Sequence, residues 1–489
     1  MTGPGGRLDV RHTEMETMSE QTQQAETTTT TTEAPVTANR RQPFPQGFLD
    51  TISSGWASRP AGTAARREQA AYAARRRDAV SAAFPGQRLV IPAGELKARS
   101  NDTDYPFRAH SAFAHLTGWA SDTEPGAVLV FEPREPGGHD VTLYFRERAD
   151  RTTAEFYANA AIGEFWIGPR PSLEEVAADL GIATAHIDTF RAGEDDRTVG
   201  EDEELDRFVS ELRLVKDEYE IAQLRLAVEV TGAGFDDIVA NLDRIVAHPR
   251  GERVVEGVFH LRARSEGNWE GYDTIAAAGP HACYLHWTRN DGAVRPGDLM
   301  LVDAGVEVDS LYTADITRTI PVNGTFSEVQ RRVYETVREA ADAAFAAARP
   351  GVRFREVHEA AMAVIARRTA EWGLLPVTAE EALDADRGGQ HRRYMVHGTS
   401  HHLGIDVHDC AQARREMYYD GLLEPGMVFT IEPGLYFQID DLTVPAEYRG
   451  IGVRIEDDIL MTADGPVNLS AGIPRTADEV EAWVARLRG

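Results

Sequence analysis

Four acidic residues in the second half of this 489-residue chain stand at the end of, or beside, a short apolar run. Asp303 ends the first run and Asp315 precedes Ile316, while Glu432 and Glu456 each follow a run of their own. Runs of this kind are typical of buried β-strands. A buried carboxylate needs a cation or a proton. Single acidic residues are usually solvated, but the repetition of the pattern in one region argues for a shared cation site.

His401, in the segment His-Gly-Thr-Ser-His, adds an imidazole to these carboxylates. Four hard oxygen ligands and one nitrogen suit Mn²⁺, Co²⁺ or Fe²⁺ better than a thiolate-rich zinc site does. Four ionised carboxylates also balance the charge of two divalent ions, which leaves room for a metal-bound hydroxide. The sequence therefore predicts a hydrolytic centre with two divalent metal ions, with Mn²⁺ as the expected ion and Co²⁺ or Fe²⁺ as alternatives.

The chain order Asp, Asp, His, Glu, Glu resembles that of the pita-bread metallopeptidases, which include methionine aminopeptidase, prolidase and aminopeptidase P. The resemblance covers roughly residues 211–489. It implies that Asp315 and Glu456 bridge the two ions together with a hydroxide. It also implies that Asp303 binds one ion, and that His401 and Glu432 bind the other.

One departure from the family pattern concerns the two aspartates. Asp315 follows Asp303 by 12 positions, where the family pattern leads us to expect eleven. We expect both to come from one hairpin, in which the extra residue either lengthens the turn near residues 307–310 or forms a bulge.

Within this family the chain resembles aminopeptidase P most closely, because its N-terminal half matches as well. The segments that carry this resemblance are residues 99–108, 272–275, 285–288, 396–401, 403–409 and 448–456. The implied reaction is release of the N-terminal residue from peptides whose second residue is proline. An Xaa-Pro bond has no N–H group, so the enzyme must recognise the proline ring and polarise the carbonyl through its metal ions.

Three further histidines are predicted at the site, because imidazole groups exchange protons near neutral pH. By the family pattern His408 contacts the substrate or the tetrahedral intermediate, while His286 and His397 help to form the proline pocket. A histidine in an apolar segment is otherwise often a packed core residue, and we assign His402 to that role.

Arg454 and Tyr272 complete the predicted site. Arg454 lies two residues before Glu456, so a strand would place both side chains on one face. The arginine would orient the carboxylate, meet a substrate carbonyl or form a structural ion pair. Tyr272 is grouped with the substrate-binding residues and is expected to hydrogen-bond a metal ligand.

Composition limits the possible partners and location. The net charge of −28 argues against nucleic acid and anionic membranes as partners, and no apolar run approaches the length of a membrane span. We expect no signal peptide, because the first residues lack an apolar segment. The two cysteines, Cys283 and Cys410, form no disulfide framework and are expected to be buried thiols, as fits a reducing cytoplasm.

The chain divides into three predicted regions. Residues 1–45 form a Thr-rich tail that is expected to be disordered. Residues 46–210 are expected to form a smaller α/β domain that mediates oligomerisation. Residues 211–489 are expected to form the α+β pita-bread catalytic domain, in which helices cover one face of a curved antiparallel sheet. Predicted helices lie near 62–84, 173–180, 221–242, 254–265, 328–348 and 355–368, and predicted N-terminal strands lie at 89–91, 127–131 and 141–145.

Several alternatives remain open from the sequence. By the family resemblance we expect a homo-oligomer, either a dimer or a tetramer. Two roles are open for Asp102, Tyr105 and Arg108. They would either lie at the mouth of a neighbouring subunit's active site or form a structural loop. Prolidase, which accepts only dipeptides, uses the same metal ligands. A non-catalytic pita-bread protein is the third possibility, although such proteins lose metal ligands that this chain keeps.

Overall fold

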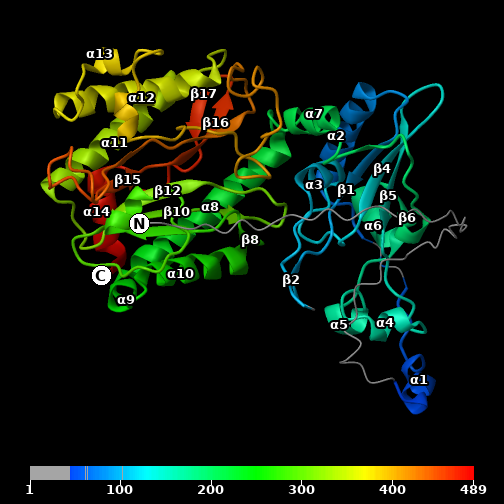
Figure 1. Ribbon diagram of the computed structural model, residues 1–489. Helices are drawn as coiled ribbons and strands as arrows, with labels where there is room; N and C mark the ends of the chain where they lie inside the picture. The colour runs from blue at the N-terminus through cyan, green and yellow to red at the C-terminus, as the bar shows by residue number, and fades with distance from the viewer. Residues whose placement is uncertain (1–43, 61, 63, 102, 489) are drawn as a thin grey trace, which may run out of the picture.

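The computed structural model describes residues 44–488 except 61, 63 and 102. Figure 1 shows two parts of the chain side by side, with α7 (Glu203–Glu211) between them. The tail predicted for residues 1–45 lies outside the described residues except for its last two, and Asp102 also lies outside them. Among the helices that are described, none is both long enough and apolar enough to cross a membrane.

The N-terminal part is built on a mixed sheet with the strand order β6-β5-β4-β1-β7. Its strands are β1 (Leu89–Pro92), β4 (Val128–Pro133), β5 (His139–Phe145), β6 (Ala183–His186) and β7 (Arg197–Thr198). The larger helices of this part are α2 (Gln69–Ala83), α3 (Ser111–Thr117) and α6 (Leu173–Leu180). Because side chains alternate along a strand, Leu89 and Ile91 join the main core while Val90 packs with Val128 in a smaller cluster.

The predicted strands of this part and the helix at 173–180 are present, but the helix predicted from residue 62 begins only at Gln69. The backbone before it is bonded elsewhere. The N–H of Gly62 donates to the Glu175 carboxylate, and the N–H of Arg67 donates to the carbonyl of Asp179. These bonds tie the segment to α6 instead of to a first helical turn.

The C-terminal part contains two small antiparallel sheets and two two-stranded ribbons, one of which pairs the short strands β8 (Trp269–Glu270) and β11 (Val306–Glu307). One sheet has the order β12-β10-β9 and the other the order β13-β16-β17, while β14 pairs with β15. Their strands are β9 (Ile275–Ala278), β10 (Leu299–Ala304), β12 (Ile316–Pro321), β13 (Val428–Ile431), β14 (Gly434–Tyr436), β15 (Gly452–Arg454), β16 (Asp457–Thr462) and β17 (Gly465–Asn468).

Two helix pairs and the C-terminal helix pack around these sheets. The helices are α8 (Glu218–Ala240), α10 (Gly251–Glu266), α11 (Glu328–Ala347), α12 (Phe354–Glu371) and α14 (Ala477–Arg488). Figure 1 shows α11 and α12 on one side of the strands and α8 with α10 on the other. The four long helices predicted for this region are therefore confirmed, as is the α+β pita-bread class.

Strand β10 shows how the two faces of its sheet differ. Met300 and Val302 belong to the core that contains α8 and α10 residues. Leu301 belongs to the second core, together with residues of α11, α12 and the C-terminal strands. By the same alternation Asp303 lies on the side of Leu301, so β10 directs its carboxylate toward the other half of the domain.

The remaining α-helices and strands are short. They are α1 (Gln46–Ile52), β2 (Ala98–Ser100), β3 (Thr103–Asp104), α4 (Ala154–Ala158), α5 (Glu164–Ile167), α9 (Leu242–Ala247) and α13 (Ala379–Ala382).

Candidate metal centre

Asp303 and Asp315 lie on one hairpin, as predicted. The pairing of β10 with β12 keeps one register, which continues to an isolated bridge between Glu307 and Thr313. No bulge therefore interrupts the ladder between the aspartates. The additional residue belongs to the turn beyond this bridge, where Leu311 adopts a left-handed conformation with φ of 68°.

A glycine makes room for a tyrosine beside the two aspartates. Gly305 is the partner of Asp315 in this register, and a Cβ at position 305 would lie 1.7 Å from the carbonyl oxygen of Ala314 and 3.0 Å from the Tyr272 ring. The Tyr272 hydroxyl lies 2.7 Å from Asp303 Oδ1 and 2.5 Å from Asp315 Oδ1. The predicted contact of Tyr272 with the acidic residues is therefore present, and it links both carboxylates.

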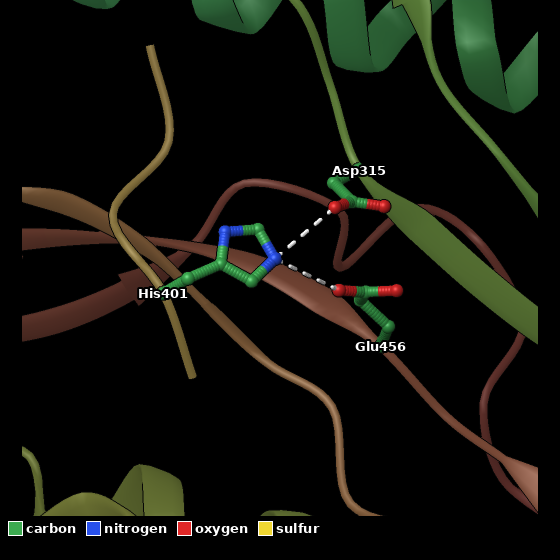
Figure 2. A group of neighbouring side chains, drawn as sticks. All are labelled: Asp315, His401 and Glu456. Atoms are coloured by element: carbon green, nitrogen blue, oxygen red, sulfur yellow. Dashed lines mark ion pairs between the residues drawn. The ribbon is translucent and has the colours of Figure 1, made fainter. Parts of the chain in front are cut away.

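His401 meets the acidic residues from a different segment of the chain. Its Nε2 atom lies 3.2 Å from Asp315 Oδ2, 3.6 Å from Glu432 Oε1 and 3.9 Å from Glu456 Oε1. Figure 2 shows this nitrogen directed at Asp315 and Glu456, and one ligand atom from each of the three residues lies within 4.8 Å of the others. Ligands at ~2.1 Å from one ion lie ~3 to 4 Å apart, so this triad fits a divalent cation.

Arg454 connects the aspartate hairpin with the glutamates. Its guanidinium contacts the Asp303 carboxylate, donates to Thr317 Oγ1 at 3.1 Å and donates to the Tyr436 hydroxyl at 3.2 Å. Thr317 in turn donates to Glu456 Oε2 at 2.8 Å. Arg454 therefore contacts Asp303 directly and reaches Glu456 through Thr317.

The cluster carries an excess of negative charge that the protein neutralises only in part. Burial and the neighbouring Asp315 raise the pKa of Glu456 well above its usual range, and burial raises the pKa of Glu432 to about 8 and that of Asp303 above normal. Burial lowers the pKa of His401, but the hydrogen bond and charge of Asp315 raise it to about 9. A group of carboxyls that retains protons in this way suits a bound cation, which takes the place of the protons.

The three accessory histidines surround this cluster. The rings of His408 and His401 are perpendicular, with centroids 4.4 Å apart. His397 Nε2 lies 2.8 Å from the Tyr436 hydroxyl. Burial lowers the pKa of His397 to about 3 and also lowers that of His408, and the exposed His286 lies close enough to contribute to both shifts. At neutral pH His397 and His408 are thus uncharged.

Two other predictions concern residues that are packed away from the chemistry. His402 is buried between the rings of Phe354 and Tyr418, at centroid distances of 4.6 and 4.7 Å. Cys283 and Cys410 are both buried and free, and burial raises the pKa of each thiol. Neither cysteine has the lowered pKa of a reactive nucleophile.

Sequence reasoning missed three polar residues of this region, although one signal was available. The three residues are Thr317, Asp458 and Tyr436. Thr317 follows Asp315 by two positions, and Asp458 follows Glu456 by two. Tyr436 on β14 pairs with Gly452, and Gly452 precedes Arg454 by two positions. Asp458 is fully buried and its Oδ2 accepts a hydrogen bond from the N–H of Asp315 at 3.2 Å. A spacing of two marks side chains on the same face of an extended segment.

Comparison with known proteins finds relatives that match nearly the whole chain. Residues 222–463 match the model of metallopeptidase family M24, and residues 72–193 match the model of the aminopeptidase P N-terminal domain. The chain is 52% identical to Xaa-Pro aminopeptidase 1 of Streptomyces coelicolor, over 94% of this chain and 96% of that relative. It is 32% identical to Xaa-Pro aminopeptidase of Escherichia coli, over 85% of this chain and 97% of that relative.

Solved structures show the same similarity. Aminopeptidase P from E. coli with the inhibitor Pro-Leu aligns with a TM-score of 0.74 at 31% identity, covering 87% of this chain and 100% of that one. Aminopeptidase PepP of Pseudomonas aeruginosa aligns with a TM-score of 0.74, covering 86% of this chain and 99% of that one. The chain is an enzyme of metallopeptidase family M24 and belongs to its Xaa-Pro aminopeptidase (aminopeptidase P) branch.

Proposed function

We propose that this chain is a dinuclear-metal aminopeptidase that hydrolyses the Xaa-Pro bond and releases the N-terminal residue from peptides with proline second. The convergence of Asp315, His401 and Glu456 carries the proposal, since their ligand atoms meet within 4.8 Å. The identity to Xaa-Pro aminopeptidases over 94% and 85% of the chain supports the substrate class.

The proposed ligands are those that the sequence suggested. Asp315 and Glu456 are the bridging ligands, Asp303 binds one ion, and His401 and Glu432 bind the other. The central position of the His401 ring nitrogen, close to three of these carboxylates, supports this assignment. When bound, divalent metal ions supply an activated water and a Lewis acid for the scissile carbonyl.

The surrounding residues then position and protonate the substrate. His408, uncharged and exposed beside His401, donates a hydrogen bond to the oxygen that becomes negative as the carbonyl is attacked. His286, His397 and Tyr436 form the pocket for the proline ring. Tyr272 and Arg454 hold the acidic ligands in place, which leaves the carboxylates less free to reorient.

This arrangement suits a substrate whose scissile bond is a tertiary amide. A tertiary amide offers no N–H to a strand-like binding groove, so recognition has to come from the ring and from the free amino group at the N-terminus. A free amine at a dinuclear centre limits cleavage to one residue, which is the behaviour of an aminopeptidase.

The test combines metal analysis with a substrate series. We expect purified protein to contain close to two divalent ions per chain and to cleave Xaa-Pro-Xaa tripeptides and longer Xaa-Pro peptides. An activity confined to Xaa-Pro dipeptides would favour prolidase instead, and peptides with alanine second serve as the control for proline specificity.

We further propose Mn²⁺ as the native ion and a homo-oligomer as the functional form. We also propose a cytoplasmic location and two domains, an N-terminal domain at 46–210 and a catalytic domain at 211–489. The oxygen-rich ligand set supports Mn²⁺. Metal analysis of protein from its own cells, and its mass in solution, test the first two.

A further inference from the structure

Arg108, in the N-terminal part, contacts two segments of the active site at once. Its Nε donates to Glu307 Oε2 at 2.5 Å, and its Nη2 donates to the carbonyl oxygen of Ile405 at 2.6 Å. Glu307 belongs to the ligand hairpin, residues 299–321. Ile405 belongs to a segment that we call the histidine loop, residues 401–410. One guanidinium therefore fixes the separation of the two segments.

A second contact of Arg108 fixes the histidine loop through Asp406. The Ser111 hydroxyl donates to Asp406 Oδ1 at 2.5 Å, and Arg108 Nη1 lies 3.2 Å from that hydroxyl and 3.4 Å from the same carboxylate oxygen. Arg213 approaches the other oxygen of Asp406 at 3.6 Å. The planar fork of arginine suits such simultaneous contacts, which a lysine ammonium cannot reproduce.

The far end of the histidine loop is held by a buried ion-pair group. Asp409 is ion-paired with Arg213 at 2.8 Å and with Lys216 at 3.1 Å, and its N–H donates to the carbonyl of His402 at 2.9 Å. Gly404 permits this closure, since a Cβ there would lie 2.1 Å from Asp409 Oδ2.

His408 stands between these two anchored acidic residues and has an exposed side chain. The contacts that fix its backbone are therefore those of Asp406 and Asp409, while the ligand hairpin opposite is held by the same Arg108. We propose that Arg108 is a positioning residue for the reaction. It sets the distance between His408 and the metal centre by joining the ligand hairpin to the histidine loop. This inference rests on the role proposed above for His408.

A purely structural role, in which Arg108 only joins the two parts of the chain, predicts something different. Loss of the residue would then lower stability with little change in turnover. A positioning role lowers kcat in folded protein with full metal content, because small displacements of a reacting group cost up to about a hundred-fold in rate.

The experiment compares Arg108→Met and Arg108→Lys with the parent enzyme. We expect Arg108→Met to lower kcat by roughly ten- to a hundred-fold on an Xaa-Pro tripeptide, with unchanged metal content and little change in KM. Arg108→Lys keeps the charge but not the fork, so it should restore only part of kcat. A kcat for Arg108→Met close to the parent value would overturn the inference.

Arg88→Met is the matched control. Arg88 also lies in the N-terminal part and also contacts two carboxylates and one carbonyl, those of Glu132, Asp196 and Arg191. It is far from both active-site segments in the chain and has no contact with them. We expect this variant to lose stability comparably and to keep its kcat. An equal loss of kcat in both variants would show a general effect of stability and would overturn the inference.

The decisive measurement places Arg108→Met in a His408→Ala background. Arg108 is inferred to act through His408, and coupled residues show non-additive effects. The substitution Arg108→Met should therefore lower kcat by less than about two-fold in the His408→Ala background. The same fold-loss in both backgrounds would overturn the inference while leaving the role of His408 intact. Full activity of His408→Ala alone would instead refute the role of His408, and the inference with it.

Discussion

Two groups of buried charged residues in this protein are balanced in opposite ways. The metal cluster gathers Asp303, Asp315, Glu432 and Glu456 against one arginine and one histidine. The group around Asp409 sets a single carboxylate between Arg213 and Lys216, all three of them almost completely buried.

The pKa values express this difference. Burial raises the pKa of Glu432 to about 8, with further contributions from Asp315 and Asp303. Burial also acts on Asp409, but Lys216 and Arg213 hold its pKa well below the usual range. A carboxyl group that is short of positive charge is suited to receive a cation, whereas one that is already paired is suited to hold a backbone in place.

The largest expected effect is loss of a bridging ligand. Glu456→Ala should reduce turnover by on the order of a thousand-fold or more, since metal ions supply several kcal/mol of transition-state stabilisation, and it should also reduce bound metal. Asp409→Ala is not a suitable control because it leaves two buried cations unpaired. Leu261→Ala, at an exposed position of α10, provides the baseline, and near-parent activity of Glu456→Ala would refute the ligand assignment.

A smaller and more diagnostic effect comes from neutralising one carboxylate in each group of the metal-free protein. Asp409→Asn should lower the free energy of unfolding by about 3–5 kcal/mol, because it breaks a buried ion pair. Glu456→Gln should leave it nearly unchanged or raise it, because the raised pKa of this carboxyl favours its protonated form and the amide carries no charge. Urea unfolding after verified chelation measures both, and a similar loss in the two variants would contradict the comparison.

The smallest effect is a pH dependence confined to the metal-free state. Glu432 and His401 have pKa values of about 8 and about 9 in the folded chain, above their unfolded values, so the folded state binds more protons. Their contribution to stability is present at low pH and is lost as pH rises through these values.

Metal removal should therefore lower the melting temperature. The difference in melting temperature between metal-loaded and chelated protein should increase from pH 6.5 to 8. Buried groups elsewhere titrate in both forms and cancel in this difference. Thermal unfolding across this pH range provides the measurement. A constant difference in melting temperature would argue against an excess of negative charge in the metal cluster.

The sequence predicted those parts of the site that depend on local patterns. Asp303 and Glu432 were identifiable because each ends an apolar run, and strand periodicity fixes the side to which such a residue points. The contacts of Arg108 and Asp409 could not be predicted in the same way. Their partners, Glu307 and Lys216, are far away in the chain. The packing of the two parts brings Arg108 to Glu307, whereas the fold of the C-terminal part itself brings Asp409 to Lys216.

The same limit applies to the fold. The long helices of the C-terminal part have a clear helical period, and the structure agrees with them closely. The start of α2 at Gln69 depends instead on hydrogen bonds that the preceding backbone makes with α6. The helix propensity of this segment competes with hydrogen bonds to residues that are distant in the chain, and a local sequence pattern does not reveal such bonds.

The order in which the acidic groups appear along the chain has a consequence for biosynthesis. During translation the hairpin with Asp303 and Asp315 emerges first, whereas Glu456 follows Asp315 by 141 residues. A nascent chain thus offers an ion only two neighbouring carboxylates, which compete poorly with water for it. Stable loading has to wait until Glu456 has been synthesised, so a copy terminated before this residue would remain inert and could not act on cellular peptides.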